Sequence, residues 1–534
     1  MERTRKLILR FTDRIGLNSK SEKRWFCVAF CLLVLYTAAI SLMQLIEFSS
    51  LNVLTAGVTI IAVPFVCFSA IYLLGKLVLI DSDTVKNKNK RICFFLVVFA
   101  LSFTLLFFWQ KAFWPGSFSP DSIDQYKQVL NASYSDWHPV LHTWLFFGLP
   151  MLFSDSPALI VSFQIVWFSL SIAYLYYVLY DNGCNKVFIL LSYLFIFANP
   201  NTAFIMLFPW KDSALTIFAT VIFTHLIRIY NTNGKWLFKW YNLGSFTLFL
   251  FLANSVRHNS ILLIAPLLIV LFVFLKNSRK RIVFSAALLI LATFVLKVPI
   301  YSLANVESPD RRQTEILGLP MTVLQNIYME DRDALDNDAR KFMDSLATQE
   351  NWEKYHNFSE FNSIKWSDKQ IPYKIENESA GKILQYTLDG ALHNPYLTLR
   401  SLISLTSMVW SIDGSKGWNI WYGVTNNEVG INAEYGVFSD SLRSYANVTN
   451  SYVTRYLFNF IGVVILLLLF SAVAKIGRKG LPKAFTVIPI LCYNFGTMLL
   501  LTGYDFRFFH LNFVIVVPLL YLLFSQQKSD NLTP

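Results

Sequence analysis

The chain has 534 residues, of which 54% are hydrophobic and only 15% are charged. Ordinary soluble chains carry about 25% charged residues, and here the hydrophobic residues fall in runs near the ~20 residues that cross a bilayer. The composition therefore excludes an ordinary soluble protein and predicts an integral membrane protein. A formal net charge of +12 is typical of basic cytoplasmic loops in such a protein, so we expect no nucleic-acid partner.

Apolar runs in chain order predict an all-α polytopic protein with about twelve transmembrane helices. The expected spans are 25–46, 52–80, 92–110, 157–180, 187–205, 211–230, 241–256, 259–276, 282–302, 453–474, 484–502 and 509–525. The stretch 139–153 is also apolar, but it is short and has Pro139 and Pro150 near its ends. We expect it to form a helix that lies at the interface or dips into the bilayer.

Basic residues support this count because they gather in every second loop, at 86–91, 235–239, 276–281 and 475–483. Lys and Arg favour the cytoplasmic side of a membrane. The distribution predicts a multi-pass protein of the cell membrane with both termini in the cytoplasm. The first apolar segment follows a basic stretch and is long enough to span, so we expect a retained anchor rather than a cleaved signal.

One large hydrophilic segment, 304–450, holds 20 acidic and 13 basic residues and is expected outside the membrane. It divides the chain into a membrane domain (1–303, with a first outer loop at 111–138), an extracytoplasmic, mainly helical domain (304–450) and C-terminal membrane helices (451–534). Within it we expect a helix over 378–393, and a helix over 396–410 along the membrane surface. A third helix would place five apolar side chains on one face: Leu335, Ala339, Phe342, Met343 and Leu346.

The six cysteines have no zinc-ligand spacing, and five of them lie in apolar segments. We therefore expect no disulfide framework.

Polar residues converge on the outer face predicted by this topology. The loop "SPDSIDQYKQVLNASYSDWHPVLHTW" covers residues 119–144, and "LFPWKDS", "NSVRHNS" and "TGYDFRFFH" join later spans on the same side. Charges near a membrane core are costly unless they are paired or functional. The side chains gathered at this face are Asp121, Asp124, Tyr126, Asp136, His138, Lys211, Asp212, Arg257, His258, Lys297 and Arg507.

Each of these side chains also has a structural explanation. Asp121 follows Pro120 and could be the N-cap of a helix. Asp124 and Asp136 could be solvated loop residues, and His138 could be an interfacial ring. Lys211 with Asp212, or Arg257 with a nearby carboxylate, could be structural ion pairs. The convergence of five distant segments on one face favours the functional interpretation.

The outer loop resembles that of the GT-C-type glycosyltransferases, which include the protein O-mannosyltransferases and the lipid A aminoarabinose transferases. The resemblance rests on Asp121 and Asp124 after an early span, on Tyr126, and on "DWHPVLHTW" with His138 and Pro139. It is closest to an uncharacterised bacterial family of that group with "PDSIDQ", "HPV" and a late "FRFF". The chain has Asp-Ser-Ile-Asp where the best-known members have adjacent Asp-Glu, and by its position after the span we prefer Asp121 as the base.

The resemblance implies a membrane glycosyltransferase that moves a sugar from a polyprenyl-phosphate donor to an acceptor of the cell envelope, whether glycan, lipid or protein. Asp121 or Asp124 would be catalytic, taking the acceptor's proton or holding a divalent metal together with His138. The metal requirement stays open. Substrate would be bound by the remaining members of the set: Tyr126, Asp136, His138, Lys211, Asp212, Arg257, His258, Lys297 and Arg507.

Two other classes of function stay open. A transporter or flippase of an envelope lipid or glycan precursor would be expected to carry ionisable groups near the middle of the membrane and repeated halves. The sequence has few polar residues within its spans and no internal repeat. A non-catalytic scaffold for envelope assembly would not depend on Asp121. The sugar, the acceptor and the oligomeric state are not encoded in any pattern that we recognise.

Overall fold

The computed structural model describes residues 20–47, 87–308, 312–412, 422–451, 454–477, 480–500 and 502–525, with positions 65, 66, 69 and 73. The predicted span 52–80 lies almost wholly outside the described residues. The protein is 79% helical. The two strands within the described ranges, β1 (Phe113–Trp114) and β2 (Glu434–Tyr435), form one antiparallel pair. The predicted all-α class is confirmed.

Six helical stretches of the described chain are long and apolar enough to cross a membrane. They are α4 (Lys88–Ala112), α8 (Pro157–Asp181), α11 (Lys211–Asn231), the run Lys276–Leu303, the run Leu481–Leu500, and the run Phe506–Phe524. A seventh would be the pair α9 (Lys186–Phe197) and α10 (Pro200–Leu207), which bends by 56° at its break. These helices are those of a membrane protein.

The longer runs are composite. The run Lys276–Leu303 contains η4 (Lys276–Ser278), α14 (Arg279–Val295), η5 (Leu296–Ile300) and α15 (Tyr301–Leu303). The run Leu481–Leu500 contains α27 (Leu481–Ala484), η7 (Phe485–Val487) and α28 (Ile488–Leu500). The run Phe506–Phe524 contains η8 (Phe506–Phe509) and α29 (Leu511–Phe524).

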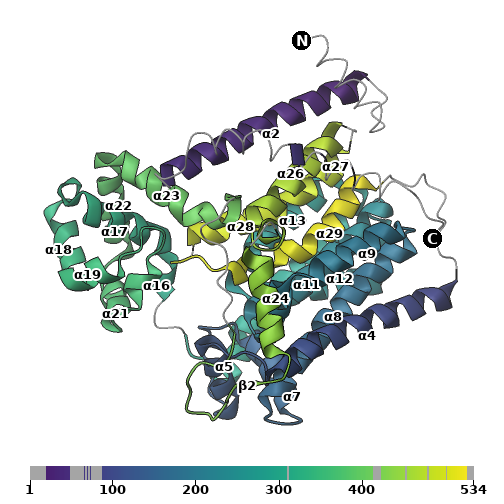
Figure 1. Ribbon diagram of the computed structural model, residues 1–534, viewed down its shortest axis with the longest axis horizontal. Coiled ribbons are helices and arrows are strands. Elements are labelled where there is room, and N and C mark those ends of the chain that lie inside the picture. The colour runs from purple at the N-terminus through teal and green to yellow at the C-terminus, as the bar shows by residue number, and fades with distance from the viewer. Residues whose placement is uncertain are drawn as a thin grey trace.

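The predicted number of twelve spans is not established, because several predicted spans form helices that are too short. They are α12 (Trp240–Val256), α13 (Ile261–Phe274) with η3 (His258–Ser260), and α26 (Ile461–Gly477), whereas α2 (Lys20–Glu47) has 28 residues. A helix of 17 residues such as α12 reaches about 26 Å, slightly less than the ~30 Å hydrocarbon core. These helices nevertheless pack with the longer ones in a single bundle (Figure 1).

Helix α11 lies at the centre of the bundle, against α8, α12 and α29. The buried hydroxyl groups of this helix form hydrogen bonds within it: Thr216, Thr220 and Thr224 each donate to the carbonyl four residues earlier, at 2.7 to 3.0 Å. This bonding removes the cost of burying a polar side chain. Because α11 is held on every side, its first residues, Lys211 and Asp212, have a fixed position at the end of the bundle.

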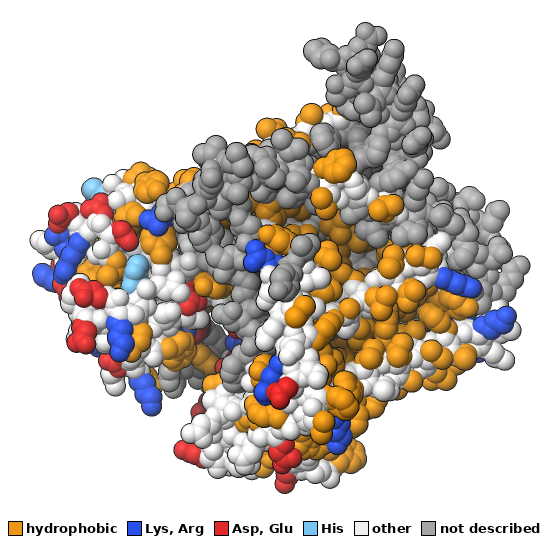
Figure 2. Space-filling model, viewed as in Figure 1, with side chains coloured by type: hydrophobic (Ala, Val, Ile, Leu, Met, Phe, Trp, Pro, Cys, Tyr) orange, Lys and Arg blue, Asp and Glu red, His pale blue; other side chains and the backbone are white. Residues whose placement is uncertain are grey.

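Apolar side chains also cover the outside of the bundle. Helix α4 exposes Leu96, Val97 and Leu101, each about half accessible. Figure 2 shows hydrophobic side chains gathered over the face that α4 and its neighbours form, and charged side chains gathered over the hydrophilic segment. Such a wide apolar surface is expected where lipid rather than water surrounds the helices.

The hydrophilic segment forms a helical body at one side of the bundle, with a core of its own (Figure 1). Four residues of the predicted face lie on one buried side of α18: Ala339, Phe342, Met343 and Leu346. Leu335 precedes this helix in an extended conformation, and none of the five is more than 7% exposed. The predicted helix 378–393 is confirmed as α22. The helices of this body are α16 (Arg312–Ile316), α17 (Gly318–Glu330), η6 (Arg332–Ala334), α18 (Asn337–Leu346), α19 (Gln349–Tyr355), α20 (Asn362–Lys365), α21 (Gln370–Asn377) and α22 (Ala380–His393).

Helix α23 (Pro395–Trp410) connects this body to the bundle. Leu397 belongs to the core of the body, whereas Leu405, Val409 and Trp410 belong to the core of the bundle, where α23 packs against α26 and α28. The expected helix over 396–410 is therefore present, and its last two turns are buried by protein. Helices α24 (Ser439–Ser451) and α25 (Arg455–Phe458) then lead into α26.

The stretch 139–153 is helical, as predicted, but it is built from three short pieces: α6 (Val140–His142), η1 (Thr143–Gly148) and α7 (Leu149–Met151). It packs against α5 (Pro120–Leu130) and α8, and ends with Leu152 and Phe153 exposed. Through the contact of η1 with α5, this stretch packs against the outer loop. Between α11 and α12 the chain turns at η2 (Lys235–Phe238), at the other end of α11 from Lys211.

Candidate functional site

Helix α5 presents Asp121 from its first turn. Ser119 is the N-cap, since its hydroxyl accepts from the Ser122 amide at 3.4 Å, and Pro120 follows it. The alternative that Asp121 caps this helix is therefore wrong, because the capping position lies two residues earlier. Ser119 also accepts from the Trp210 indole N–H at 2.7 Å. This bond ties the start of α5 to the residue before Lys211 and leaves the Asp121 carboxylate free for other partners.

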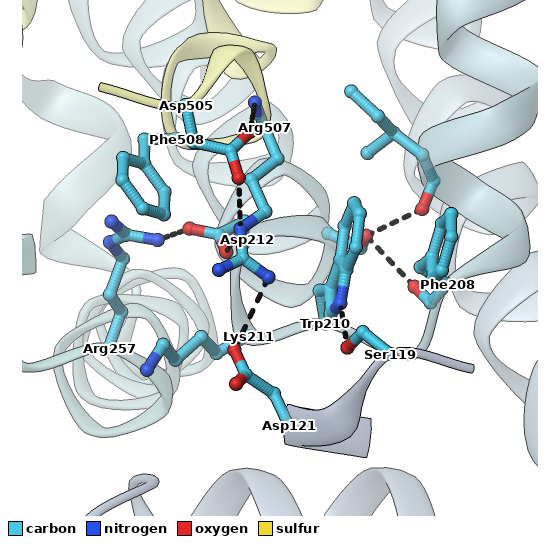
Figure 3. A network of polar contacts seen from close by, with 12 residues as sticks. Ser119, Asp121, Phe208, Trp210, Lys211, Asp212, Arg257, Asp505, Arg507 and Phe508 are labelled. Atoms are coloured by element: carbon cyan, nitrogen blue, oxygen red, sulfur yellow. Dashed lines mark hydrogen bonds and ion pairs between the residues drawn. The ribbon is translucent and has the colours of Figure 1, made fainter. Parts of the chain in front are cut away.

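The partner of Asp121 is Arg507, on η8 between the last two helices. Its guanidinium lies 3.3 Å from the Asp121 carboxylate, 3.0 Å from Asp505 and 3.8 Å from Asp212. The Trp210 ring lies against it, 4.7 Å from ring centre to guanidinium carbon. Figure 3 shows Arg507 between Asp121 and Asp505. The contact of Arg507 with its neighbour Asp505 is thus one part of a larger group of charges.

The charges around Asp121 decide its protonation. Burial opposes its ionisation, but the positive groups nearby, above all Arg507, outweigh burial and hold the pKa of the Asp121 carboxyl below its usual range. Asp121 is therefore a carboxylate at neutral pH. A carboxylate that is so well compensated is a weak base until its surroundings change.

Asp212 and Arg257 form a buried ion pair, with side chains 1% and 4% exposed. The first turn of α11 favours the negative charge of Asp212 through its free amide groups. Arg257 also donates to Asn259 at 2.5 Å and lies over the Phe508 ring, 4.7 Å from its centre. The contacts of Arg257 with Asp212 and Asn259 favour the alternative that this guanidinium belongs to a structural ion pair.

Lys211 has a different environment. Its ammonium group lies 3.4 Å from Nδ1 of His138. Within the described part of the chain no carboxylate lies within the 4.0 Å of an ion pair with it. Burial lowers the pKa of His138 to about 3, and the charge of Lys211 acts in the same direction. His138 is therefore neutral and can accept from Lys211, so Lys211 is a cation held by a neutral ring.

Asp136 is the centre of a second group of polar contacts, which involves the end of the outer loop. Its carboxylate accepts from Lys297 at 3.3 Å and from the Tyr301 hydroxyl at 3.2 Å, and its carbonyl oxygen lies 3.1 Å from Nε2 of His258. Asp136 is 7% exposed, so it is not a solvated loop residue. These contacts fasten the outer loop to η3 and to the end of the α14–α15 run.

Asp124 and Tyr126 lie apart from these groups. The Asp124 side chain is 54% exposed, accepts from Gln128 at 2.8 Å, and comes no closer than 3.8 Å to His138. It borders a surface hollow with Lys127 and Glu428. The Tyr126 hydroxyl donates to the carbonyl of Asp155 at 2.8 Å. Of the two aspartates predicted as catalytic, Asp121 is therefore the one that faces the cavity described next.

A cavity of about 350 Å³ opens at this end of the bundle. Six of the predicted side chains line it: Asp121, His138, Lys211, Arg257, His258 and Arg507. The other wall of the cavity was not predicted from the sequence, and it comes from the hydrophilic body and from the turn before η8. That wall contains Glu315, Asn362, Lys365, Trp366 and Thr502.

The two walls are joined at Thr502. Its carbonyl accepts from the amides of Phe361 and Asn362 at 2.9 and 3.1 Å. A Cβ atom at Gly503 would lie 2.5 Å from the Asn362 side chain, so glycine permits this close approach. Lys365, 2% exposed, forms an ion pair with Glu315 beside the cavity. Nothing in the hydrophilic sequence distinguishes these residues, and contact with distant segments alone makes them part of the cavity.

The predicted metal ligands do not fit a metal site. Among the residues that the structure describes, no three His, Cys, Asp or Glu side chains gather as possible ligands. Asp121 is held by Arg507, and Asp124 is largely exposed beside a different hollow.

No family model, curated protein or solved structure matches the chain. The fold and the site define an all-α protein with the apolar helices of a membrane protein and a charged cavity at one end of its helix bundle.

Proposed function

We propose that this protein is a membrane glycosyltransferase that moves a sugar from a polyprenyl-phosphate donor to an acceptor of the cell envelope. The observation that carries the proposal is that Asp121 and Lys211 line the same cavity at the end of the bundle. Among the described residues, Lys211 is a cation that has no carboxylate partner. A transfer of this kind needs both a proton acceptor and a cation for the departing phosphate. The resemblance of the outer loop to GT-C enzymes supports the same assignment.

The reaction would proceed by displacement at the anomeric carbon of the sugar. The acceptor hydroxyl oxygen forms a bond to that carbon, and its proton passes to the Asp121 carboxylate. The bond from the carbon to the phosphate oxygen breaks, and the phosphate leaves with the electron pair. Lys211 stabilises the negative charge of the phosphate. Arg507 positions Asp121, and Arg257 stays in its ion pair with Asp212.

Donor binding would also activate the base. The positive groups at the cavity hold the pKa of Asp121 low. A phosphate at Lys211 offsets one of those charges, so the pKa of Asp121 rises when the donor is present. The carboxylate then becomes a better proton acceptor at the moment when the acceptor hydroxyl must be deprotonated.

The proposed topology places the cavity outside the cytoplasm. It has about twelve spans, both termini in the cytoplasm and the body 304–450 outside. Single cysteines at 90 and 280 should be protected from an impermeant thiol reagent in intact cells after removal of the native cysteines, and a cysteine at 350 should react. Reaction at 280 without reaction at 350 would reverse the orientation.

The function itself is tested by comparing the cell-surface glycans of cells with and without the gene by mass spectrometry, with the Asp121→Asn variant as a third sample. We expect one glycan, glycolipid or glycoprotein to lose a sugar in the deletion and in the variant alike. Restoration of the wild-type pattern by Asp121→Asn would contradict the proposal and would favour a flippase or a scaffold, which need no base.

A further inference from the structure

A second cavity lies in the bundle, far from the first one along α11. It has a volume of about 460 Å³ and is lined by α8, α11 and α12, with mostly aromatic and aliphatic side chains. On α11 it extends from Ile217 to His225. These residues are six and fourteen positions after Lys211, or about 9 and 21 Å along the helix axis.

His225 gives this apolar cavity one distinctive polar group. Its side chain lines the cavity and is 3% exposed. Rings of Tyr174, Trp236 and Phe249 surround it at 4.9 to 5.9 Å between centres. Nε2 has Ser245 at 3.5 Å, and Nδ1 has no hydrogen-bond partner among the described residues. A buried ring nitrogen without a partner is costly. Nδ1 is itself covered in this conformation, and a rotation of the His225 ring that turns it to the cavity would let a ligand there supply the missing bond.

Positive charge lies beside the same cavity. Lys235 directly precedes the lining residue Trp236 in the chain, Lys239 lies two residues before the lining residue Tyr241, and both lysines are exposed. No carboxylate pairs with either lysine within the described ranges. Arg281 lies over the Trp240 ring, 4.3 Å from its centre. Exposed Trp and Tyr with neighbouring Lys and Arg are typical of the level where a bilayer meets water, and basic pockets between helices at that level bind anionic head groups.

We infer that this cavity binds an anionic glycerophospholipid of the bilayer. One acyl chain fills the space along α8 and α11, an ester oxygen or hydroxyl pairs with His225, and the phosphate lies near Lys235 and Lys239. The three features are independent, and one amphiphile satisfies all of them. The site lies toward the other end of α11 from the charged cavity, so the inference does not rest on the proposed transferase activity.

The test uses the full-length protein in phosphatidylcholine vesicles that contain a little phosphatidylglycerol with a photoreactive group on its acyl chain. Mass spectrometry locates the cross-links. We expect them in the segments Trp167–Tyr174 and Ile217–His225 at several times the level found on the lipid-exposed face of α14. Unlabelled phosphatidylglycerol should compete more strongly than phosphatidylcholine.

Variants define the contacts. Ser171→Trp and Val221→Trp fill the cavity and should reduce its labelling about fivefold or more, whereas Val283→Trp, on the exposed face of α14, should not. His225→Phe keeps an aromatic side chain but has no ring nitrogens. It should weaken competition by unlabelled phosphatidylglycerol by about three- to tenfold. Replacing Lys235 and Lys239 by Gln should abolish the preference for phosphatidylglycerol.

Wild-type labelling that is uniform over α8, α11 and α14 would overturn the inference, and this result does not depend on the folding of any variant. Stronger competition by polyprenyl phosphate than by phosphatidylglycerol would also overturn it, because the cavity would then hold the chain of the proposed donor. If unlabelled phosphatidylcholine competes as strongly as phosphatidylglycerol, the inferred preference for an anionic head group is wrong.

Discussion

Asp121 and Arg507 lie 386 positions apart in the chain, and their side chains meet at 3.3 Å. The contact joins the first outer loop to the turn between the last two helices. Because Arg507 also reaches Asp505 and Asp212, it links three carboxylates from distant segments, of which Asp121 lines the cavity. Two kinds of cation therefore line the cavity. Arg257, Lys365 and Arg507 are paired with carboxylates. Lys211 has no carboxylate partner among the described residues.

The ion pair of Arg257 and Asp212 should be needed for stability rather than for donor recognition. Arg257→Met removes the nearer of the two guanidinium groups beside the buried Asp212 charge and leaves only Arg507, at 3.8 Å. The change should cost up to about 3–5 kcal/mol. The double variant with Asp212→Leu should recover much of that loss, since no uncompensated charge remains. The measurement is thermal unfolding of the purified variants in detergent.

A matched control is the exposed pair of Arg332 and Asp344, whose side chains are each 47% exposed. Arg332→Met should change the unfolding free energy by no more than about 1 kcal/mol. If Arg257→Met unfolds like the wild type and instead loses donor affinity, the pair is not structural and the phosphate assignment moves back to Arg257.

Lys211 is predicted to bind the donor phosphate. Lys211→Met removes a charge-assisted contact and should weaken apparent donor affinity by about 10- to 100-fold. Acceptor affinity should change little. The rate of transfer is measured against donor concentration and, separately, against acceptor concentration. Lys127→Met is the control, because Lys127 pairs with Glu428 at the surface, at 3.2 Å. Unchanged donor dependence in Lys211→Met would exclude this residue as the phosphate ligand.

Stability should fall as the pH is lowered from about 6.5 toward 3, partly because of His138. Its pKa is lowered to about 3 by burial and by Lys211, whereas an imidazole in the unfolded chain titrates near 6.5. Between these values the unfolded state binds more protons than the folded state, so acid favours unfolding. The stabilisation is complete above the unfolded pKa and is lost progressively below it.

His138→Asn cannot titrate and should show a smaller drop in melting temperature between pH 7 and pH 5 than the wild type. The exposed His393 provides the control, and His393→Asn should leave the drop unchanged. An identical pH dependence in wild type and His138→Asn would show that His138 is not the buried neutral ring described above.

Sequence reasoning found one half of the charged cavity. Asp121, His138, Lys211, Arg257 and Arg507 were brought together because short loops at one end of a helix bundle must converge, and charges in such loops need a reason to be retained. The apolar face of α18 was also predictable, since its period of 3.6 residues is local to the chain.

The rest depended on contacts between distant segments. No local pattern distinguishes Asp124 from Asp121, yet one borders a different hollow and the other faces Arg507. The pairing of Arg257 with Asp212 follows from the register of α11 against α12. The wall formed by Glu315, Lys365 and Trp366 exists because the hydrophilic body docks on Thr502. The number of spans does not follow from the apolar runs alone, because several of these runs fold into helices shorter than a bilayer.

The central claim is that Asp121 serves as the base of a sugar transfer, and it is tested most directly with purified protein in liposomes. The liposomes contain polyprenyl-phosphate sugars, and mass spectrometry follows the release of free polyprenyl phosphate together with the glycosylated product. Asp121→Asn should lower the rate by about 10² or more, while Asp124→Asn, altered at the exposed aspartate, should stay within a few-fold of wild type. Both variants should unfold near the wild-type temperature. Full transfer by Asp121→Asn, or loss of transfer in Asp124→Asn alone, would contradict the account.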